Sequence, residues 1–510
     1  MRDEYTKIDF KAFENLSPFE IKDELIRLAH AYSDKSAHAF LNAGRGNPNW
    51  IATRAREAFF LLGQFAMTEA RRSYDDEEAG LAGMPPVAGC HGRLLKWLEK
   101  RDDDTPGAVT LKKVVTFGIE RFGFDADRFV HELTDSVVGD NYPVPDRALH
   151  HNEEIVHEYL MWAMCSGHRP KAKFDLYPVE GGTAAMCYIF KTLKNQRLLN
   201  AGDTIALATP IFTPYLEMPA LEDYALKSVY IGEEEEDAFQ FTAADLKALE
   251  NPKVKALFMV NPGNPSSVAM DPEAIKMLVE LVTKKRPDLM ILTDDVYGTF
   301  VQNFESIMGH LPRNTIGVYS YSKYFGCTGW RLGVIAVAQN NIFDSMIAAH
   351  PEKIHKVLET RYSALTPDPR GMKFIDRIVA DSRDVALNHT AGLSLPQQVM
   401  MTLFSLVEMM DTDKVYQKAC MAICTRRFDS LVVNMGIQVD AGPYYDHYYG
   451  IIDFEFWMRK YLGEEVVQWI KKNIHPLDIA FKLAQDHGMV LLNGSGFDAP
   501  NWSARVSFAN

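Results

Sequence analysis

The chain has 510 residues, of which 47% are hydrophobic and 24% are charged, and its formal net charge is −14. This length and composition exclude global disorder and predict two or more domains with sizeable cores. The acidic balance argues against a nucleic-acid-binding protein, which would carry a basic stripe.

The N-terminal residues, from Met1 to Lys7, lack the apolar core of a signal peptide, and no apolar run is long enough to span a bilayer. The cysteine spacing is not typical of a disulfide or zinc framework; the six cysteines are Cys90, Cys165, Cys187, Cys327, Cys420 and Cys424. Cys420 and Cys424 share one face of an expected helix, where we expect buried thiols. We therefore expect a cytoplasmic protein.

The first notable motif in chain order is Leu41–Pro48, in which Arg45 stands between Gly44 and Gly46. Glycines let the backbone approach a ligand closely, so Arg45 is a candidate binding residue. Taken alone, an arginine here is more often one half of a surface salt bridge. From Tyr74 to Asp140, glycine, proline and charged clusters with some helical turns interrupt the pattern, and we interpret this stretch as an insertion.

Three histidines follow the insertion, at His150, His151 and His157. They lack a recognisable carboxylate–histidine framework, so we expect surface or core residues rather than a metal site.

From Thr204 to Val337, short apolar strands alternate with helical stretches, which predicts a three-layer α/β domain with a mostly parallel sheet. A helix is expected at Asp271–Lys285, with Asp271 as its N-cap and Pro272 in its first turn. The predicted strands are Thr204–Ala208, Lys227–Ile231, Val254–Val260, Leu289–Thr293, Thr315–Tyr319 and Leu332–Val337. The acidic run Glu233–Asp237 is interpreted as a solvated loop.

Functional side chains of such a domain gather where strands end. After the apolar stretch Leu176–Val179, Gly181, Gly182 and Thr183 open a helix whose backbone amides can bind an anion. Phe212, after the strand at Thr204, can stack on a flat ring. Either feature alone is weak, because Gly-Gly-Thr sequences and aromatic side chains occupy ordinary structural positions too.

Asn264 lies between two Asn-Pro steps, which force a sharp turn, and Asn264–Pro265 is a candidate cis peptide bond. Asp294 ends the next strand, where a buried carboxylate can support a cationic ring nitrogen. Tyr297, three residues later, can donate a hydrogen bond to a phenolic oxygen on the same ring. Asn264 can bind that oxygen as well. An ordinary turn is the alternative for Asn264, and a helix N-cap is the expected role of Asp295.

The stretch Tyr319–Lys323, followed by Gly329–Gly333, is the most informative of the chain. Lys323 can form a Schiff base with an aldehyde, while the hydroxyls of Ser320 and Ser322 and the guanidinium of Arg331 can hold a phosphate dianion. Pyridoxal 5′-phosphate needs both functions. A strand end with a solvated lysine would be the alternative if this motif stood alone.

The C-terminal part predicts a smaller α+β domain, with a long amphipathic helix at Asp413–Met435. Its short strands are expected at Ile437–Ala441, Ile451–Phe454, Met489–Leu492 and Ala504–Phe508. Arg505, within the last strand, can hold a carboxylate through two parallel hydrogen bonds. A surface salt bridge is the alternative.

Together these motifs resemble the fold-type I, aspartate aminotransferase superfamily of pyridoxal-phosphate enzymes, and the resemblance covers Leu41 to Phe508. It implies a three-layer αβα large domain at 51–410 with the insertion near 74–140, and a small domain built from 411–510 and residues 1–50. The resemblance assigns the phosphate to Gly182, Thr183, Ser320, Ser322 and Arg331, with Phe212 stacked on the ring.

By the same resemblance Lys323 is the Schiff-base lysine and the general base at the substrate Cα, and Asp294 pairs with the ring nitrogen. Asn264 and Tyr297 hold the phenolic oxygen, with Asn264 also facing the substrate. Arg505 binds the substrate α-carboxylate, Gly46 lies in the substrate-covering loop, and Arg45 is the candidate for tuning the grip on the distal carboxylate. Tyr142 resembles a tyrosine that reaches the phosphate of a neighbouring subunit, which implies a homodimer with shared active sites.

The chain departs from a standard aminotransferase in its length, its insertion, the loop Gly44–Trp50 and the aromatic run Tyr444–Tyr449. These features resemble the bacterial aspartate 4-decarboxylases, which convert L-aspartate to L-alanine and CO2, keep an aminotransferase activity with 2-oxo acids, and assemble dimers into larger homo-oligomers such as dodecamers. The alternative is an ordinary aspartate or aromatic amino-acid aminotransferase. A pyridoxal-phosphate-binding transcription regulator would need a basic winged helix, which residues 1–40 do not suggest.

Overall fold

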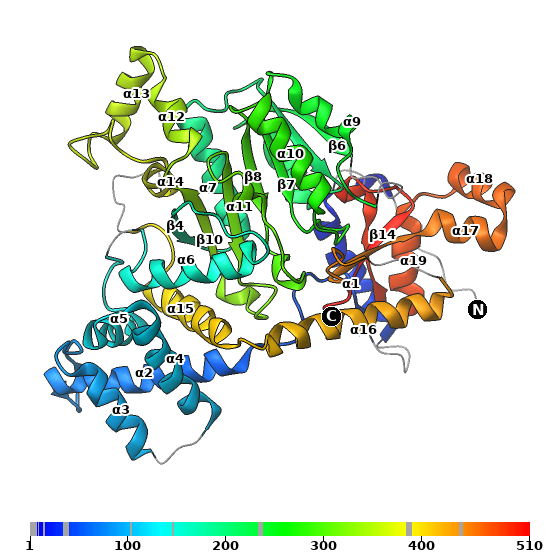
Figure 1. Cartoon of the computed structure of the whole chain (residues 1–510). Helices are drawn as coiled ribbons and strands as arrows, with labels where there is room; N and C mark the ends of the chain where they lie inside the picture. The colour runs from blue at the N-terminus through cyan, green and yellow to red at the C-terminus, as the bar shows by residue number, and fades with distance from the viewer. Residues whose placement is uncertain are drawn as a thin grey trace.

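The computed structural model describes residues 8, 10–13, 16–33, 40–101, 105–144, 147–232, 238–383, 390–437 and 442–510. The acidic loop predicted at Glu233–Asp237 and residues 438–441 of the strand predicted at Ile437–Ala441 lie outside the described residues. Figure 1 shows a central sheet with helices packed around it, a helical bundle on one side and a smaller α/β unit on the other.

The central sheet of the described chain has the strand order β4-β10-β9-β8-β7-β5-β6. All its neighbours pair in parallel except β10, which runs antiparallel to β4 and β9. The predicted strands and the mostly parallel arrangement are confirmed, with ends within two residues. The bounds are β4 Phe174–Val179, β5 Thr204–Thr209, β6 Lys227–Gly232, β7 Val254–Val260, β8 Met290–Asp294, β9 Thr315–Ser320 and β10 Gly333–Ala338.

The apolar strands form the middle layer of the fold, and helices cover both faces of their sheet. Every residue of β4, β8, β9 and β10 is buried, as expected for strands enclosed on both faces. α10 begins as predicted, with the Asp271 carboxylate accepting a hydrogen bond from the Ala274 amide at 2.8 Å. The helices of this part are α6 His150–Cys165, α7 Gly182–Asn195, α8 Thr213–Glu217, α9 Ala243–Lys247, α10 Pro272–Lys284, α11 Ile307–His310, α12 Ile342–Ala348, α13 Glu352–Tyr362 and α14 Phe374–Arg383.

The predicted insertion is more regular than its glycines and prolines suggest. It contains a short hairpin and three helices, of which α4 and α5 pack against α2 and α15 while α3 packs against α5, at the lower left of Figure 1. Gly118 lies inside α4, where a Cβ would meet the Phe129 ring at 2.7 Å, so this glycine permits close helix packing rather than a loop. The elements are α2 Thr53–Ser73, β2 Asp75–Asp76, β3 Leu81–Ala82, α3 Cys90–Lys100, α4 Pro106–Phe122, α5 Ala126–Val138 and α15 Leu395–Met410.

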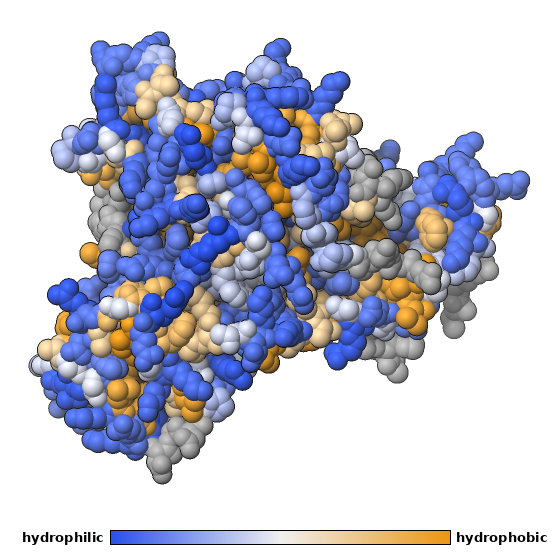
Figure 2. Space-filling model, in the orientation of Figure 1, coloured by the Kyte–Doolittle hydropathy of each residue, from blue (hydrophilic) through white to orange (hydrophobic). Residues whose placement is uncertain are grey.

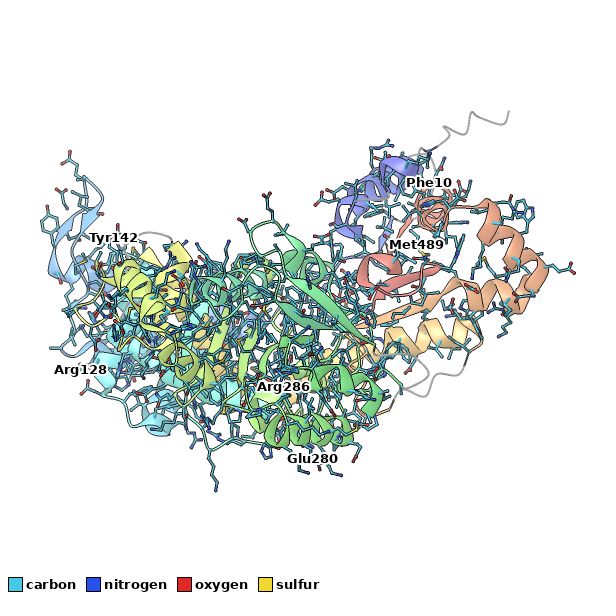
Figure 3. All side chains as sticks on the ribbon, turned by 90° about the horizontal axis from the view of Figure 1, so that it is seen from above. Phe10, Arg128, Tyr142, Glu280, Arg286 and Met489 are labelled. Atoms are coloured by element: carbon cyan, nitrogen blue, oxygen red, sulfur yellow. The ribbon has the colours of Figure 1, made fainter. Side chains whose placement is uncertain are left out.

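Both ends of the chain build the smaller unit, as Phe10 and Met489 at one end of the molecule in Figure 3 illustrate. α1 packs on α19 through a shared apolar cluster, and β1 pairs in parallel with β12. The strand predicted at Met489–Leu492 is split, because β12 pairs with β1 while β13 joins β14 and β11. The elements are α1 Pro18–Ser33, β1 Leu41–Asn42, α16 Val415–Met435, β11 Tyr449–Asp453, α17 Phe454–Leu462, α18 Glu464–Asn473, α19 Leu477–His487, β12 Met489–Val490, β13 Leu492–Asn493 and β14 Ser503–Ser507.

The face shown in Figure 2 is largely hydrophilic, with scattered apolar patches that include parts of the helical bundle. Within the described ranges, no helix combines the length and the apolar character needed to cross a bilayer. All six cysteines are free thiols; five of them, including Cys420 and Cys424, are buried as expected for that pair, whereas Cys187 is exposed. His151, one of the three histidines for which a metal site was not expected, forms a hydrogen bond with the Glu132 carboxylate and packs on the Phe124 ring.

Candidate active site

A cavity of about 320 Å³ opens where the strands of the central sheet meet the smaller unit. It brings together twelve of the residues predicted from the sequence, which are Gly46, Gly182, Thr183, Phe212, Asn264, Asp294, Tyr297, Ser320, Ser322, Lys323, Arg331 and Arg505. The remaining lining residues are Phe19, Asn47, Tyr215, Val260, Val296, Thr328 and Tyr449. The cavity therefore draws on segments from α1 to β14.

One end of the cavity is suited to an anion. α7 begins there at Gly182, as predicted, and presents the amide groups of its first turn. The Ser320 hydroxyl donates to the Ser322 hydroxyl at 2.9 Å. The hydrogen bonds that the structure gives the Arg331 guanidinium go to the carbonyl oxygens of Thr328 and Glu180, at 3.1 and 3.2 Å, so its charge has no bonded carboxylate among the described residues.

Asp294 ends β8 and is 6% exposed. It accepts hydrogen bonds from the Tyr215 hydroxyl at 2.7 Å and from the Val296 amide at 3.2 Å. Burial raises the pKa of Asp294 to about 6, against the effect of these two donors. A cation placed against this carboxylate would replace the solvation that burial removes.

Tyr215 is a site residue that the sequence analysis missed. It follows Phe212 by three residues, and the two rings meet edge to face with centroids 5.2 Å apart. The spacing was a usable signal, because residues three apart share a helix face and α8 starts between them. Phe212 itself is half-buried and lines the cavity, where it can cover a flat ring.

Asp295 is not the helix N-cap that the sequence suggested. The chain after β8 forms turns, and the Asp295 carboxylate is buried, accepting hydrogen bonds from the Thr293 and Ser306 hydroxyls. Burial raises the pKa of Asp295 to about 7. The N-cap belongs to Ser306, whose side chain accepts from the Met308 amide at the start of α11. The Asp295 carboxylate thus holds the hydroxyl of Ser306, the residue that caps α11.

Lys323 lies at the centre of the cavity, and its Nζ donates to the Gly46 carbonyl at 3.1 Å. Burial is the main reason that the pKa of Lys323 falls below its ordinary value; Tyr449 and Asp294 oppose this effect, while the positive charge of Arg505 adds to it. A lowered pKa increases the share of neutral amine, which is the form that attacks an aldehyde.

Arg505 is a buried cation, 1% exposed, at the other end of the cavity. Its Nη1 donates to the Asn264 side-chain oxygen at 3.0 Å and its Nη2 to the Gly44 carbonyl at 2.9 Å, while its Nε has no hydrogen-bond partner among the described residues. The predicted cis bond at Asn264–Pro265, which is confirmed, lies in the turn that presents Asn264. A buried guanidinium with an unused N–H fits a carboxylate ligand.

The aromatic run of the smaller unit supplies contacts that the sequence analysis did not assign. The hydroxyls of Tyr297 and Tyr449 share a hydrogen bond of 3.0 Å, and the Tyr448 hydroxyl donates to the Gly46 carbonyl at 2.8 Å. A Cβ on Gly46 would lie 2.9 Å from the Tyr449 hydroxyl and 3.1 Å from Lys323 Nζ. A side chain at position 46 would therefore displace the Tyr449 hydroxyl or the Lys323 amine.

Two predicted site residues lie outside the cavity lining. The Arg45 side chain is exposed and its Nε donates to the Asn47 side-chain oxygen at 3.0 Å. Tyr142 is 64% exposed on the side of the helical bundle (Figure 3). Neither position contacts the cavity within one chain.

The donor set fits pyridoxal phosphate. It offers an anion site with Arg331, a carboxylate at Asp294 for a ring nitrogen, a hydroxyl at Tyr297 for a phenolic oxygen and an amine at Lys323 for an aldehyde. Arg505 remains for a substrate carboxylate. Among the described residues, no cluster of side chains suited to a metal ion competes for this assignment.

Comparison with known proteins agrees with this geometry. Residues 176–355 match the family model "Aminotransferase class I and II". Over 503 residues the chain is 46% identical to the "Bifunctional aspartate aminotransferase and L-aspartate beta-decarboxylase" of a Pseudomonas species, covering 98% of this chain and 94% of that protein. It is 24% identical to the aspartate aminotransferase of Sulfolobus acidocaldarius, over 61% of this chain and 66% of that protein.

Solved aspartate aminotransferases share the fold. The Thermus thermophilus enzyme, as a single mutant, superposes with a TM-score of 0.57 at 15% identity, covering 96% of this chain and 92% of that chain. The Rhizobium meliloti enzyme gives a TM-score of 0.57 at 15% identity, covering 99% and 95%. The architecture is thus that of the fold-type I enzymes expected from the sequence.

Proposed function

The chain belongs to the class I and II aminotransferases, and we propose that it converts L-aspartate to L-alanine and CO2, with aspartate aminotransferase activity at the same site. The full-length similarity to the bifunctional Pseudomonas enzyme carries this proposal. The cavity supports it with two separate anion-binding positions on either side of Lys323.

The cofactor is pyridoxal 5′-phosphate, which supplies an electron sink for the pair left when a bond at the substrate Cα breaks. Gly182, Thr183, Ser320, Ser322 and Arg331 hold its phosphate, and Phe212 covers its ring. Asp294 bears a negative charge toward the ring nitrogen, and Tyr297 and Asn264 face the phenolic oxygen. These roles are consistent with the lining of the cavity and with the burial of Asp294.

Two residues act on the substrate itself. Arg505 binds the α-carboxylate through its guanidinium, which is already oriented by Asn264 and Gly44. The amine of Lys323 removes the proton from Cα as a general base, and its lowered pKa makes the neutral form accessible. The rings of Tyr449 and Phe497, at 4.2 and 4.8 Å from the Arg505 guanidinium carbon, exclude water from this contact.

The distal carboxylate of aspartate is held less firmly. The cations that line the described cavity are Lys323, Arg331 and Arg505, and each already has a position in the scheme. A tight cation would stabilise the carboxylate more than the neutral CO2 that departs. A cavity whose own chain offers no further cation to that carboxylate therefore favours its loss. Arg45 stays a proposed tuning residue that would have to approach from its exposed position.

The proposal is tested by incubating purified holoenzyme with L-aspartate, with and without a 2-oxo acid, and measuring alanine, CO2 and oxaloacetate. We expect alanine and CO2 in equal amounts, and oxaloacetate when the 2-oxo acid is added. Lys323→Ala should lose both reactions. Oxaloacetate without CO2 would instead identify an ordinary aminotransferase, and no turnover of aspartate would refute the proposal.

For the assembly we propose a homodimer in which Tyr142 of each chain completes the partner's phosphate site, with dimers joined into a larger homo-oligomer such as a dodecamer. The exposure of Tyr142 at the surface of one chain is compatible with this role. For the location we propose the cytoplasm, where thiols remain reduced, and all six cysteines are free in the structure.

A further inference from the structure

The two proposed reactions differ in whether the substrate Cβ gains a proton. Both begin with loss of the proton from Cα. Decarboxylation then breaks the bond between Cβ and the distal carboxyl carbon, so that the carboxyl group leaves as CO2 and the electron pair stays with the substrate. Cβ must gain a proton in return, whereas transamination adds none at Cβ. A decarboxylase therefore benefits from an acid that faces Cβ.

Tyr449 occupies such a position. It is 1% exposed, is the first residue of β11, and lines the cavity. The Tyr449 hydroxyl and Lys323 Nζ flank the same point above Gly46, at 2.9 and 3.1 Å from where a Cβ of that residue would lie. Because Lys323 serves the substrate Cα, a hydroxyl across this narrow gap is within reach of the adjoining carbon.

The ring of Tyr449 also contacts the group that orients the substrate. It packs on the Arg505 guanidinium, whose central carbon is 4.2 Å from the ring centroid. The backbone of Tyr449 is fixed on both sides, because its amide donates to the Ser267 hydroxyl at 2.8 Å and its carbonyl accepts from the Tyr445 hydroxyl at 2.7 Å. The phenol is thus held in one place relative to the substrate carboxylate.

The other acids that line the described cavity are committed elsewhere. Tyr215 donates to Asp294, and Tyr297 is assigned to the phenolic oxygen of the cofactor. Lys323 carries the proton that leaves Cα and the one that returns there. The serine and threonine hydroxyls are much weaker acids than a phenol. Tyr449 remains, and its hydrogen bond to Tyr297, 3.0 Å long, connects it to a second phenol.

We propose that Tyr449 is a catalytic residue of the decarboxylation branch, whose phenol donates the proton that replaces the departing carboxyl group at Cβ. The phenolate then regains a proton from water, so the sum is one aspartate and one proton giving one alanine and one CO2. This inference rests on the proposed decarboxylase function. It predicts that loss of the Tyr449 hydroxyl slows decarboxylation more than transamination, although the two reactions share one cavity.

The test is Tyr449→Phe in the holoenzyme, which removes the hydroxyl and keeps the ring on Arg505. We expect alanine and CO2 formation to fall about 100-fold, within the range typical of general-acid catalysis, and to fall much further than oxaloacetate formation with a 2-oxo acid, so that the alanine-to-oxaloacetate ratio drops. The matched control is Tyr444→Phe, which removes a half-buried phenol of the same aromatic run that lies outside the cavity lining. The control should keep the wild-type ratio of products.

Binding of maleate, a dicarboxylate without an amino group, supplies a readout that does not depend on turnover. Calorimetry should give Tyr449→Phe a maleate affinity close to wild type, because Arg505 is intact. An unchanged alanine-to-oxaloacetate ratio in the variant would overturn the role of Tyr449, and so would a parallel loss of both reactions together with maleate binding. Absence of CO2 from the wild-type enzyme would instead overturn the proposed function itself.

Discussion

A single buried carboxylate, Asp294, shows how much of the site depends on burial. In water an aspartate is ionised above about pH 4. Within β8 the loss of hydration raises the pKa of Asp294 to about 6, although Tyr215 and the Val296 amide donate to it. The carboxylate is thus charged at neutral pH but lacks a counter-ion among its hydrogen-bond partners, which is the condition for holding a cationic ring.

The first prediction concerns Asp294→Asn. At pH 8 we expect the apoprotein variant to bind pyridoxal phosphate about 10- to 100-fold more weakly, since a hydrogen bond to a charged group contributes about 1.5–3 kcal/mol. The wild-type carboxylate is protonated as the pH falls through about 6, so the difference should close below that pH. Fluorescence titration of cofactor binding between pH 5 and 8 measures this. A constant difference across the range would contradict the assignment.

Several elements converge on the turn that carries Lys323, immediately after β9. The Tyr324 carbonyl accepts hydrogen bonds from Trp50 Nε1 at 3.1 Å and from the Tyr416 hydroxyl at 2.9 Å. The Tyr324 hydroxyl donates to Glu408 of α15 at 2.6 Å. Glu408 is 1% exposed, and burial raises its pKa to about 8. The turn is therefore fixed from α15, α16 and the segment before α2.

The second prediction follows from this raised pKa. Between about pH 4.5 and 8, Glu408 is ionised in the unfolded chain but protonated in the folded one, so its contribution to stability falls as pH rises, by about 1.4 kcal/mol per pH unit. Glu408→Gln cannot ionise and should lack this one contribution to the fall in stability over the window. Urea unfolding measured from pH 5 to 8 should show that the stability of Glu408→Gln relative to the wild type increases with pH. The control variant Glu99→Gln, at an exposed residue, should show no such increase. Parallel curves would mean that Glu408 is ionised in the folded state.

At the scale of the whole molecule, the cavity lies at the junction of segments distant in sequence. The segment Gly44–Gly46, near the N-terminus, accepts hydrogen bonds from Lys323 in the middle of the chain and from Arg505 near its C-terminus. In the dimer we propose, Tyr142, which lies outside the cavity of its own chain, would contribute to the partner's cavity. Activity should therefore depend on residues distributed over two copies.

The third prediction tests this sharing by complementation. Lys323→Ala and Tyr142→Ala should each impair activity as homodimers. Mixed after reversible dissociation, they should recover roughly a quarter of wild-type activity, because half of the dimers are hybrids and each hybrid has one intact site. A mixture of Lys323→Ala with Asp294→Ala should recover none, since both residues serve the cavity of their own chain. No recovery in the first mixture would exclude a shared site.

The sequence by itself determined the strands and the groups at their ends. Apolar runs bounded by Gly, Pro and Asn define β7, β8 and β9 within a residue or two, because a strand buried on both faces must be continuously apolar. Lys323 and Asp294 were identifiable because each follows such a run, and parallel strands present their ends at one edge. Asp271 was identifiable as a cap from its own side chain and the proline after it.

Only the tertiary structure decided the contacts between distant segments. Tyr215 on Asp294, Tyr449 between Lys323 and Arg505, and Asp295 behind the Ser306 cap depend on how side chains pack across the sheet and between units. Gly118 is one of the glycines of the predicted insertion, and only the packing shows that it allows α4 to approach Phe129 closely. Local sequence specifies backbone preference and burial, whereas hydrogen-bond partners far apart in the chain are chosen when the elements pack together.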